Sequence, residues 1–226
     1  AYALSKLVNP LYQPTDYTEV DQDAIAGSFY LTFDDKERAF QRAQASVQAG
    51  IEPWKGHELL GNMYNNAAFG PQTADSLRQD YITLALAQYD KAIRAKPDYL
   101  NGYLNKALVY LQQEDFLPAE ALLQKSLDID PNFTPAIQYM MMIYKVKATR
   151  NGNDRNYAQK WLQYALHLDE LNPENPFIRL DIGLAYCTLG SCNQALNYLN
   201  SEFLAMPNLP AEELKTAKRC LKQCGG

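Results

Sequence analysis

Small and aromatic side chains recur in a fixed register along the chain. Five tyrosines stand at long, regular intervals, and three residues before each lies a small residue or, in one case, a methionine. Residues three apart share one face of a helix, so each pair predicts a helix that lets a neighbour approach closely beside a tyrosine that fills the adjacent space. The tyrosines are Tyr30, Tyr64, Tyr110, Tyr144 and Tyr186, and the residues before them are Gly27, Gly61, Ala107, Met141 and Gly183.

A second helix is expected after each of these helices. An alanine follows each tyrosine, and we expect it to lie opposite the small residue of the first helix. Prolines close the later units, because proline cannot continue a helix. The alanines are Ala39, Ala85, Ala119, Ala158 and Ala195, and the prolines are Pro97, Pro131, Pro173 and Pro207.

The spacing of the tyrosines indicates a repeat with two insertions. The separations are 34 (64 − 30), 46 (110 − 64), 34 (144 − 110) and 42 (186 − 144) residues. We interpret the two longer intervals as insertions of 12 (46 − 34) and 8 (42 − 34) residues, in residues 66–80 and 145–156. Insertions in repeat proteins form loops, and these loops either contact a partner or are simply solvated.

This pattern resembles the tetratricopeptide repeat, whose period is about 34 residues and whose motif is W-x2-L-G-x2-Y…A-x3-F…P. Leu60-Gly61-x2-Tyr64 followed by Ala85-x3-Tyr89 matches it best, and Ile182-Gly183-x2-Tyr186 is nearly as good. The resemblance implies an all-α fold, a right-handed α-solenoid of about five helix pairs plus a C-terminal capping helix. We therefore predict three parts: an N-terminal arm (1–17), a repeat array (18–208) and the capping helix (209–226).

The same resemblance implies a binding surface, since the first helices of this family line a concave groove that takes a peptide or helix of another protein. Helical phase from the tyrosines gives its expected residues, amide-rich at one end and apolar at the other. The leucines among them have an alternative role, packing between repeats or against the arm. The residues are Lys55, Glu58, Asn62, Asn65, Asn66, Asn101, Leu104, Asn105, Leu108, Gln112, Gln138, Tyr139, Met142, Lys145, Phe177, Leu180, Leu184 and Thr188.

The carboxylate clamp that holds chaperone C-termini is not expected in this groove. Asn62 and Asn105 occupy the asparagine positions of that clamp, but Glu58, Pro135 and Tyr139 stand where its cations would be. A terminal carboxylate would be desolvated against Glu58, which is unfavourable. An internal segment of a partner is therefore the expected ligand.

All four cysteines lie in the last 40 of the 226 residues, at Cys187, Cys192, Cys220 and Cys224. An even, clustered set favours two disulfides that join the capping helix to the last repeat. Either Cys187–Cys220 with Cys192–Cys224 or the swapped pairing satisfies this expectation. A four-thiolate zinc site, which these spacings fit poorly, and reduced buried thiols are the alternatives. Disulfides would place the protein in an oxidising compartment.

Charge and motifs exclude several other functions. The formal net charge is −5 with both signs interspersed, whereas a nucleic-acid binder would show a basic stripe. No apolar run approaches the roughly 20 residues that span a bilayer. The two histidines, His57 and His167, lie far apart, and the sequence shows neither a Gly-rich phosphate loop nor a G-x-S-x-G motif. We therefore predict no enzyme activity, no cofactor and no metal.

Together these observations predict a scaffold that binds another protein in the groove. We expect an assembly or stability factor for an envelope or secretory complex, in the periplasm or another extracytoplasmic compartment. A cytosolic adaptor with reduced cysteines is the alternative, and an enzyme subunit with a composite site is a distant third.

Overall fold

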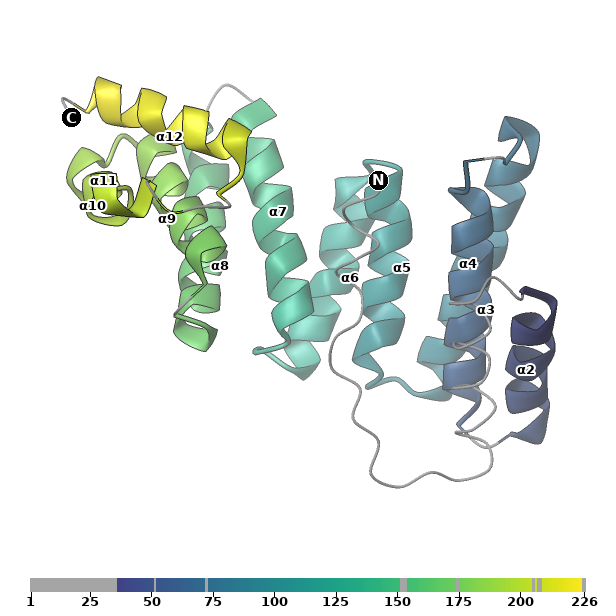
Figure 1. Cartoon of the computed structure of the whole chain (residues 1–226). Coiled ribbons are helices and arrows are strands. Elements are labelled where there is room, and N and C mark those ends of the chain that lie inside the picture. Colours follow the sequence, from purple (N-terminus) through teal and green to yellow (C-terminus); the bar gives the residue numbers. More distant parts are fainter. Residues whose placement is uncertain are drawn as a thin grey trace. The chain divides into compact units, whose positions relative to one another are not determined.

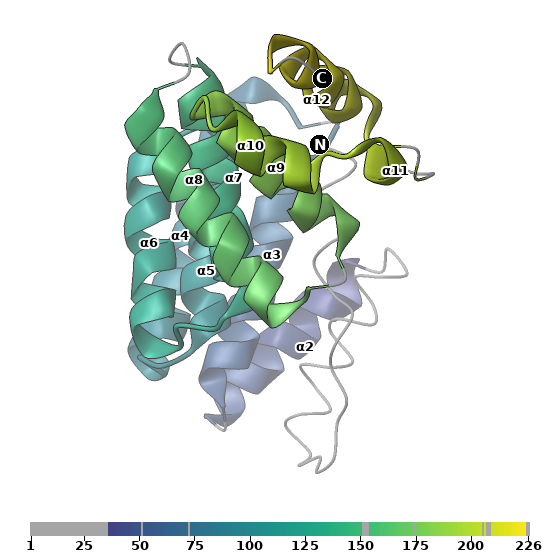
Figure 2. The same cartoon turned by 90° about the vertical axis from the view of Figure 1, so that its left-hand side faces the viewer.

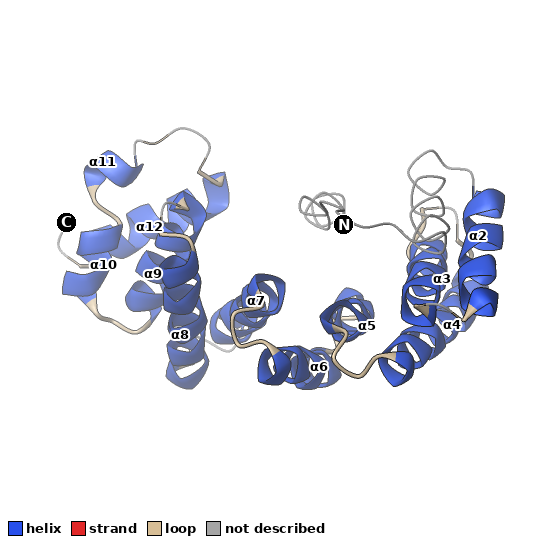
Figure 3. Ribbon diagram, turned by 90° about the horizontal axis from the view of Figure 1, so that it is seen from below, coloured by secondary structure: helices blue, strands red, loops and turns tan. Residues whose placement is uncertain are grey.

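The structure is a computed structural model that describes residues 36–50, 52–71, 73–150, 154–173, 175–204, 206 and 209–224. Within these ranges the ordered elements are helices joined by short loops (Figure 1, Figure 3). The expected N-terminal arm (1–17) lies outside them, as do Gly27 and Tyr30 of the first repeat.

The chain divides into two compact units, Ala1–Asn105 and Lys106–Gly226. In the first unit, α2 (Lys36–Ala49) and α4 (Asp75–Ala95) both pack on α3 (Pro53–Ala68). The boundary between the units falls within α5 (Leu100–Gln112).

The second unit is a succession of helices, of which α6 to α10 each pack on the next (Figure 2). α6 packs on α7, α7 on α8, and α8 on α9, while α9 also contacts α10 and α12. These helices are α6 (Phe116–Ile129), α7 (Thr134–Arg150), α8 (Arg155–Leu171), α9 (Pro176–Thr188), α10 (Cys192–Tyr198), α11 (Ser201–Leu204) and α12 (Ala211–Gln223).

Close helix approach explains the glycines of the repeat motif. A Cβ atom on Gly61 would lie 2.5 Å from the ring of Tyr89, and one on Gly183 would lie 2.4 Å from Cγ of Leu199. The expected partners, the alanines Ala85 and Ala195, are fully buried. The side chains that come closest to the glycines stand four residues, one helical turn, after these alanines.

Helix ends follow the punctuation in the sequence. Pro53 and Pro176 are the first residues of α3 and α9, where the missing N–H is not needed. The side chain of Asp154 accepts hydrogen bonds from two backbone N–H groups at the start of α8, and Asn175 accepts one at the start of α9. These caps satisfy N–H groups that the helix itself leaves unpaired.

The insertions lengthen helices more than loops. α4 has 21 residues and begins at Asp75, inside the first insertion. α7 and α8 have 17 residues each; residues 145–150 of the second insertion lie in α7 and residues 155–156 in α8, while residues 151–153 lie outside the described ranges. The expectation of two inserted loops is therefore only partly right, because both insertions also lengthen helices.

Candidate protein-binding surface

Glu58 is the centre of a hydrogen-bond network in the first unit. The Tyr99 hydroxyl donates to Oε2 of Glu58 at 2.5 Å, and Nδ2 of Asn105 donates to Oε1 at 2.7 Å. Burial raises the pKa of the Glu58 carboxyl, and the two hydrogen bonds and the charge of Lys55 oppose that rise. The Glu58 side chain therefore links α3 to α5, through Asn105, and to Tyr99, the residue just before α5.

The two asparagines at clamp positions are engaged within the protein. Asn105 is buried and donates to Glu58, and Oδ1 of Asn62 accepts the hydroxyl of Tyr89 at 2.7 Å. Burial raises the pKa of Tyr89, so its hydroxyl remains a donor at neutral pH. These amides position helices, and an incoming peptide would have to displace internal partners to use them.

Other amides of the first unit face solvent. Asn66 and Asn101 are exposed, and Asn65 and Leu104 are half-buried. The Asn65 Oδ1 atom is itself buried, without a hydrogen-bond partner among the described residues. Asn66 and Asn101 are thus the amides that a partner can reach.

In the second unit, α7 combines exposed amide and half-buried apolar side chains on one face. Gln138 is exposed, whereas Tyr139 and Met142 are half-buried. Burial raises the pKa of Tyr139. In the part of α5 that belongs to this unit, Leu108 is half-buried and Gln112 exposed. The face of α7 made by Gln138, Tyr139 and Met142 is hereafter called the α7 face.

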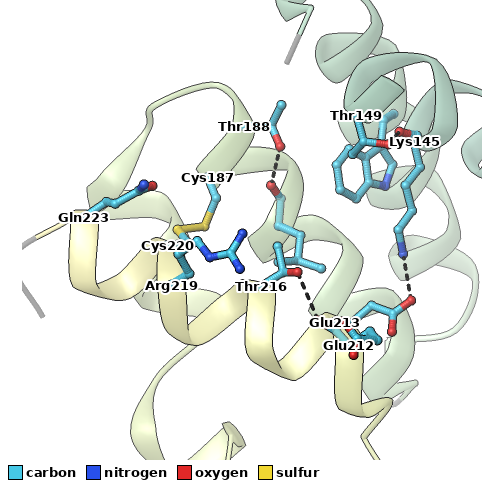
Figure 4. A pocket seen from close by; sticks show the side chains of 12 residues that line it. Lys145, Thr149, Cys187, Thr188, Glu212, Glu213, Thr216, Arg219, Cys220 and Gln223 are labelled. Carbon is cyan, nitrogen blue, oxygen red and sulfur yellow. Dashed lines mark hydrogen bonds and ion pairs between the residues drawn. A yellow bond between two sulfur atoms is a disulfide. The ribbon is translucent and has the colours of Figure 1, made fainter. Parts of the chain in front are cut away.

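The apolar end of the expected groove is not open. Leu180 is only 2% exposed and Leu184 only 4% exposed, so neither side chain is open to a partner in this structure. Leu184 helps to line a cavity of about 430 Å³ that Thr216 and Arg219 of α12 also line (Figure 4). Among the expected apolar contacts on α9, Phe177 remains exposed.

Two disulfides fasten α12 to the last repeat. Cys187 of α9 bonds to Cys220, and Cys192 at the start of α10 bonds to Cys224. This is one of the two pairings expected from the sequence. α12 packs on α9, and its first turn also reaches α7, where Glu213 meets Lys145 (Figure 4). The helix therefore bridges α9 and α7.

Lys145 is the polar centre of the second unit. Its Nζ atom lies 2.8 Å from Oδ1 of Asp181, 3.6 Å from Oε1 of Glu213, and 5.7 Å from the centre of the Trp161 ring. Burial raises the pKa of Asp181, and the charge of Lys145 opposes that rise. Asp181, Glu213 and Trp161 were missed in the sequence, although Asp181 stands two residues before the motif glycine Gly183.

The described ranges show neither a metal site nor a membrane-spanning helix. They contain no group of three or more His, Cys, Asp or Glu residues placed to hold a metal ion. His57 instead contacts Oε1 of Gln88 at 2.8 Å, and His167 contacts Oδ1 of Asn132 at 3.0 Å. No helix among the residues described has the length and apolar character to cross a membrane.

Comparison with known proteins places the fold. No family model matches the sequence, and no curated protein does. Among solved structures, PilF of Pseudomonas aeruginosa matches with a TM-score of 0.64 and 14% identity, over 91% of this chain and 88% of that one. YrrB, described as a TPR protein with an unusual peptide-binding site, matches with a TM-score of 0.58 and 17% identity, over 87% of this chain and 90% of that one.

The chain has the tetratricopeptide-repeat fold. MamA has a comparable likeness, with a TM-score of 0.58 and 14% identity over 91% of this chain and 93% of its own. At such identities the tetratricopeptide likeness establishes architecture, and the binding surface has to be argued from the residues themselves.

Proposed function

We propose that this protein is a non-catalytic scaffold whose first helices bind a peptide or helical segment of another protein. The observation that carries the proposal is the α7 face, where exposed Gln138 adjoins half-buried Tyr139 and Met142. Tyrosine and methionine supply adaptable apolar contact area, and an amide can both donate to and accept from a peptide backbone. The likeness to YrrB, a protein described as having a peptide-binding site, supports a peptide ligand.

The proposed ligand is an internal, uncharged segment. In the first unit, Glu58 occupies the place where a carboxylate-binding groove would carry a cation. A chain terminus carrying its own carboxylate would meet this acid in a partly dehydrated setting, and both charges would be destabilised. Asn66 and Asn101, which are exposed, suit the backbone of an extended segment.

We place the scaffold in an oxidising compartment, as an assembly or stability factor for an envelope or secretory complex. Support comes from the pairing of all four cysteines into two disulfides, because such bonds persist outside the reducing cytosol. Alkylation of thiols in the native cell, followed by mass spectrometry, separates this from the cytosolic alternative. Chains with no alkylated cysteine support the oxidising compartment, and chains with four support a cytosolic adaptor.

The binding surface is tested by site-specific photo-crosslinking. A photoreactive amino acid is introduced at Tyr139 or Asn66, and at the exposed control positions Gln124 on α6 and Thr83 on α4. We expect a discrete protein adduct in the native cell from the first two positions and none from the controls. Adducts of equal yield at all four positions would refute a specific surface.

A matched affinity measurement then uses the partner segment found in this way. Tyr139→Ala combined with Met142→Ala removes two half-buried side chains, and we expect binding to weaken at least about tenfold, equivalent to about 1.4 kcal/mol. The control Gln124→Ala should bind as the unsubstituted chain does. If the double variant bound the segment with unchanged affinity, the crosslink at Tyr139 would reflect only that the partner lies nearby, and not that it binds to this surface.

A further inference from the structure

Helix α12 covers a surface of the second unit that would otherwise be open. It crosses from α9, where Cys220 is bonded to Cys187, to α7, where Glu213 meets Lys145 (Figure 4). We propose that α12 is a redox-released cover. Reduction of the two disulfides by a dithiol frees α12 and exposes the surface around Trp161 and Leu184, while the helices beneath stay folded.

Apolar packing holds α12 only weakly. Among its 13 residues, Ala217 and Cys220 are the buried ones, and both are small. A cavity of about 430 Å³ remains beside it, lined in part by Trp161, Leu184 and Thr188. This cavity is open to solvent, since exposed residues such as Thr149 and Thr216 also line it, so α12 does not pack closely against the helices on that side. An isolated helix of this length is also marginally stable in water, and α12 would therefore lose helicity once it was undocked.

Polar contacts allow the release as well. The ion pair that joins α12 to α7 is Lys145–Glu213, at 3.6 Å. Lys145 lies closer to Asp181, at 2.8 Å, and Asp181 belongs to α9 rather than to α12. When α12 leaves, Lys145 keeps this carboxylate, and partly exposed Glu213 returns to water. The Asp181–Lys145 pair therefore stays intact, and the large cost of leaving a buried charge without its partner does not arise there.

The two disulfides differ in accessibility. Cys192 and Cys224 are both partly exposed, whereas Cys220 of the other disulfide is buried. A thiolate of the dithiol attacks one sulfur of Cys192–Cys224 and forms a mixed disulfide. The second thiol of the reagent then closes the oxidised dithiol and leaves two protein thiols. The same exchange at Cys187–Cys220 follows, and reduction of both bonds consumes two molecules of dithiol.

Release changes which residues a partner can reach. Trp161 is 1% exposed and Leu184 is 4% exposed with α12 in place, and both line the cavity that α12 covers. An aliphatic or aromatic side chain of a partner would fit this uncovered surface. That last step rests on the proposed scaffold function, whereas the release of α12 does not depend on it.

Trp161 provides the test, using the full chain with Trp54→Phe so that the emission comes from Trp161 alone. Quenching of this emission by iodide is measured before and after dithiothreitol, together with hydrogen exchange of the α12 and α9 amides. After reduction we expect the quenching constant to rise several-fold and α12 amides to exchange at least about tenfold faster, with α9 amides still protected. Emission intensity itself is not used, because the loss of a nearby disulfide alters it.

Three comparisons complete the test. A variant with all four cysteines replaced by serine (Cys187→Ser, Cys192→Ser, Cys220→Ser, Cys224→Ser) should show the raised quenching and the fast α12 exchange without any reductant. In a Trp161→Phe chain the emission comes from Trp54, and its quenching should not change when dithiothreitol is added. Protected α12 amides in a chain with four free thiols would overturn the proposal, because packing alone would then hold the helix. Loss of protection in α9 together with α12 would also overturn it, since the disulfides would then support the whole last repeat. Failure of the photo-crosslinking at Tyr139 would count against the scaffold function but not against the release.

Discussion

Each unit carries a buried carboxylate on a first helix, but the two are satisfied in different ways. Glu58 in the first unit accepts hydrogen bonds from two neutral groups, Tyr99 and Asn105. Asp181 in the second unit is held by the charge of Lys145. Burial raises the pKa of both carboxyls.

The difference lies in what remains when the carboxylate is removed. Without Glu58, the Asn105 amide, which is itself buried, loses its hydrogen-bond acceptor. Without Asp181, Lys145 still has Glu213 at 3.6 Å. We therefore expect the loss of the carboxylate to destabilise the network of neutral donors around Glu58 more than the ion pair of Asp181, whose lysine has a second carboxylate nearby.

The largest expected effect comes from removing the two carboxylates. We expect Glu58→Ala to lower the free energy of unfolding of the first unit by about 2–3 kcal/mol, since the buried Asn105 amide loses its acceptor. Asp181→Ala should lower that of the second unit by less, about 1–2 kcal/mol, because Lys145 keeps a carboxylate. Hydrogen exchange of the α3 and α9 amides measures each unit separately.

A matched control for Glu58→Ala is Glu52→Ala, which removes only the partly exposed ion pair with Lys55. We expect this control to change stability by no more than about 0.5 kcal/mol. The comparison between the units fails if Asp181→Ala proves at least as damaging as Glu58→Ala.

An intermediate effect is expected at the two glycines of the helix pairs. A methyl group on Gly61 meets the Tyr89 ring, which its hydrogen bond to Asn62 holds in place. We expect Gly61→Ala to cost about 1–2 kcal/mol, as overpacking outweighs the gain in helix propensity. Gly183→Ala should cost less, because Leu199 follows the last residue of the short helix α10 and, unlike Tyr89, its side chain has no hydrogen bond that holds it in place.

Urea denaturation of both variants measures this difference. Thr83→Ala, a substitution at an exposed position of α4, is the control and should lie within about 0.5 kcal/mol of the unsubstituted chain. Equal losses at Gly61 and Gly183 would show that the tyrosine ring is no more rigid a neighbour than the leucine.

The smallest expected effect is a dependence on pH. The pKa of Glu58 in the folded chain lies above its ordinary value of 4.5, so the folded state takes up a proton before the unfolded state does. The stability that protonation of Glu58 contributes is therefore fully present below the ordinary pKa of the carboxyl and is lost as the pH rises through the raised pKa of the folded chain. Glu58→Gln should abolish this part of the pH dependence.

Urea midpoints between pH 7 and pH 5, followed by Trp54 emission in a Trp161→Phe background, measure this contribution. Glu52→Gln is the control and should leave the pH profile unchanged. A profile that is the same in Glu58→Gln and in the unsubstituted chain would mean that Glu58 does not titrate in this range.

The sequence predicted the helix pairs because their contacts repeat locally. Gly61 and Tyr64 share a face, and Pro97 follows the end of α4 at Ala95, so one unit carries the information for its own fold. The extension of α7 into the second insertion was not predicted, although the chain offers no helix breaker between Lys145 and Gly152. An uninterrupted run of helix-forming residues from Lys145 was the available signal for a longer α7.

The binding surface was harder to predict because it depends on contacts between repeats. Glu58 and Asn105 are 47 residues apart, and helical phase alone does not indicate that one side chain uses the other as its acceptor. Leu184 was assigned to the groove from its helical phase, but it is only 4% exposed. It shares a cavity with residues of α12, and no repeat motif encodes the ion pair by which α12 reaches α7.

The disulfides of α12 have a practical consequence for any laboratory that produces the protein. A chain made in a reducing host and a chain exported from the cell would share one sequence but present different C-terminal surfaces. Buffers that contain a thiol would convert the second form into the first during purification. The oxidation state of the sample therefore has to be fixed, and checked by mass, before two binding measurements are compared.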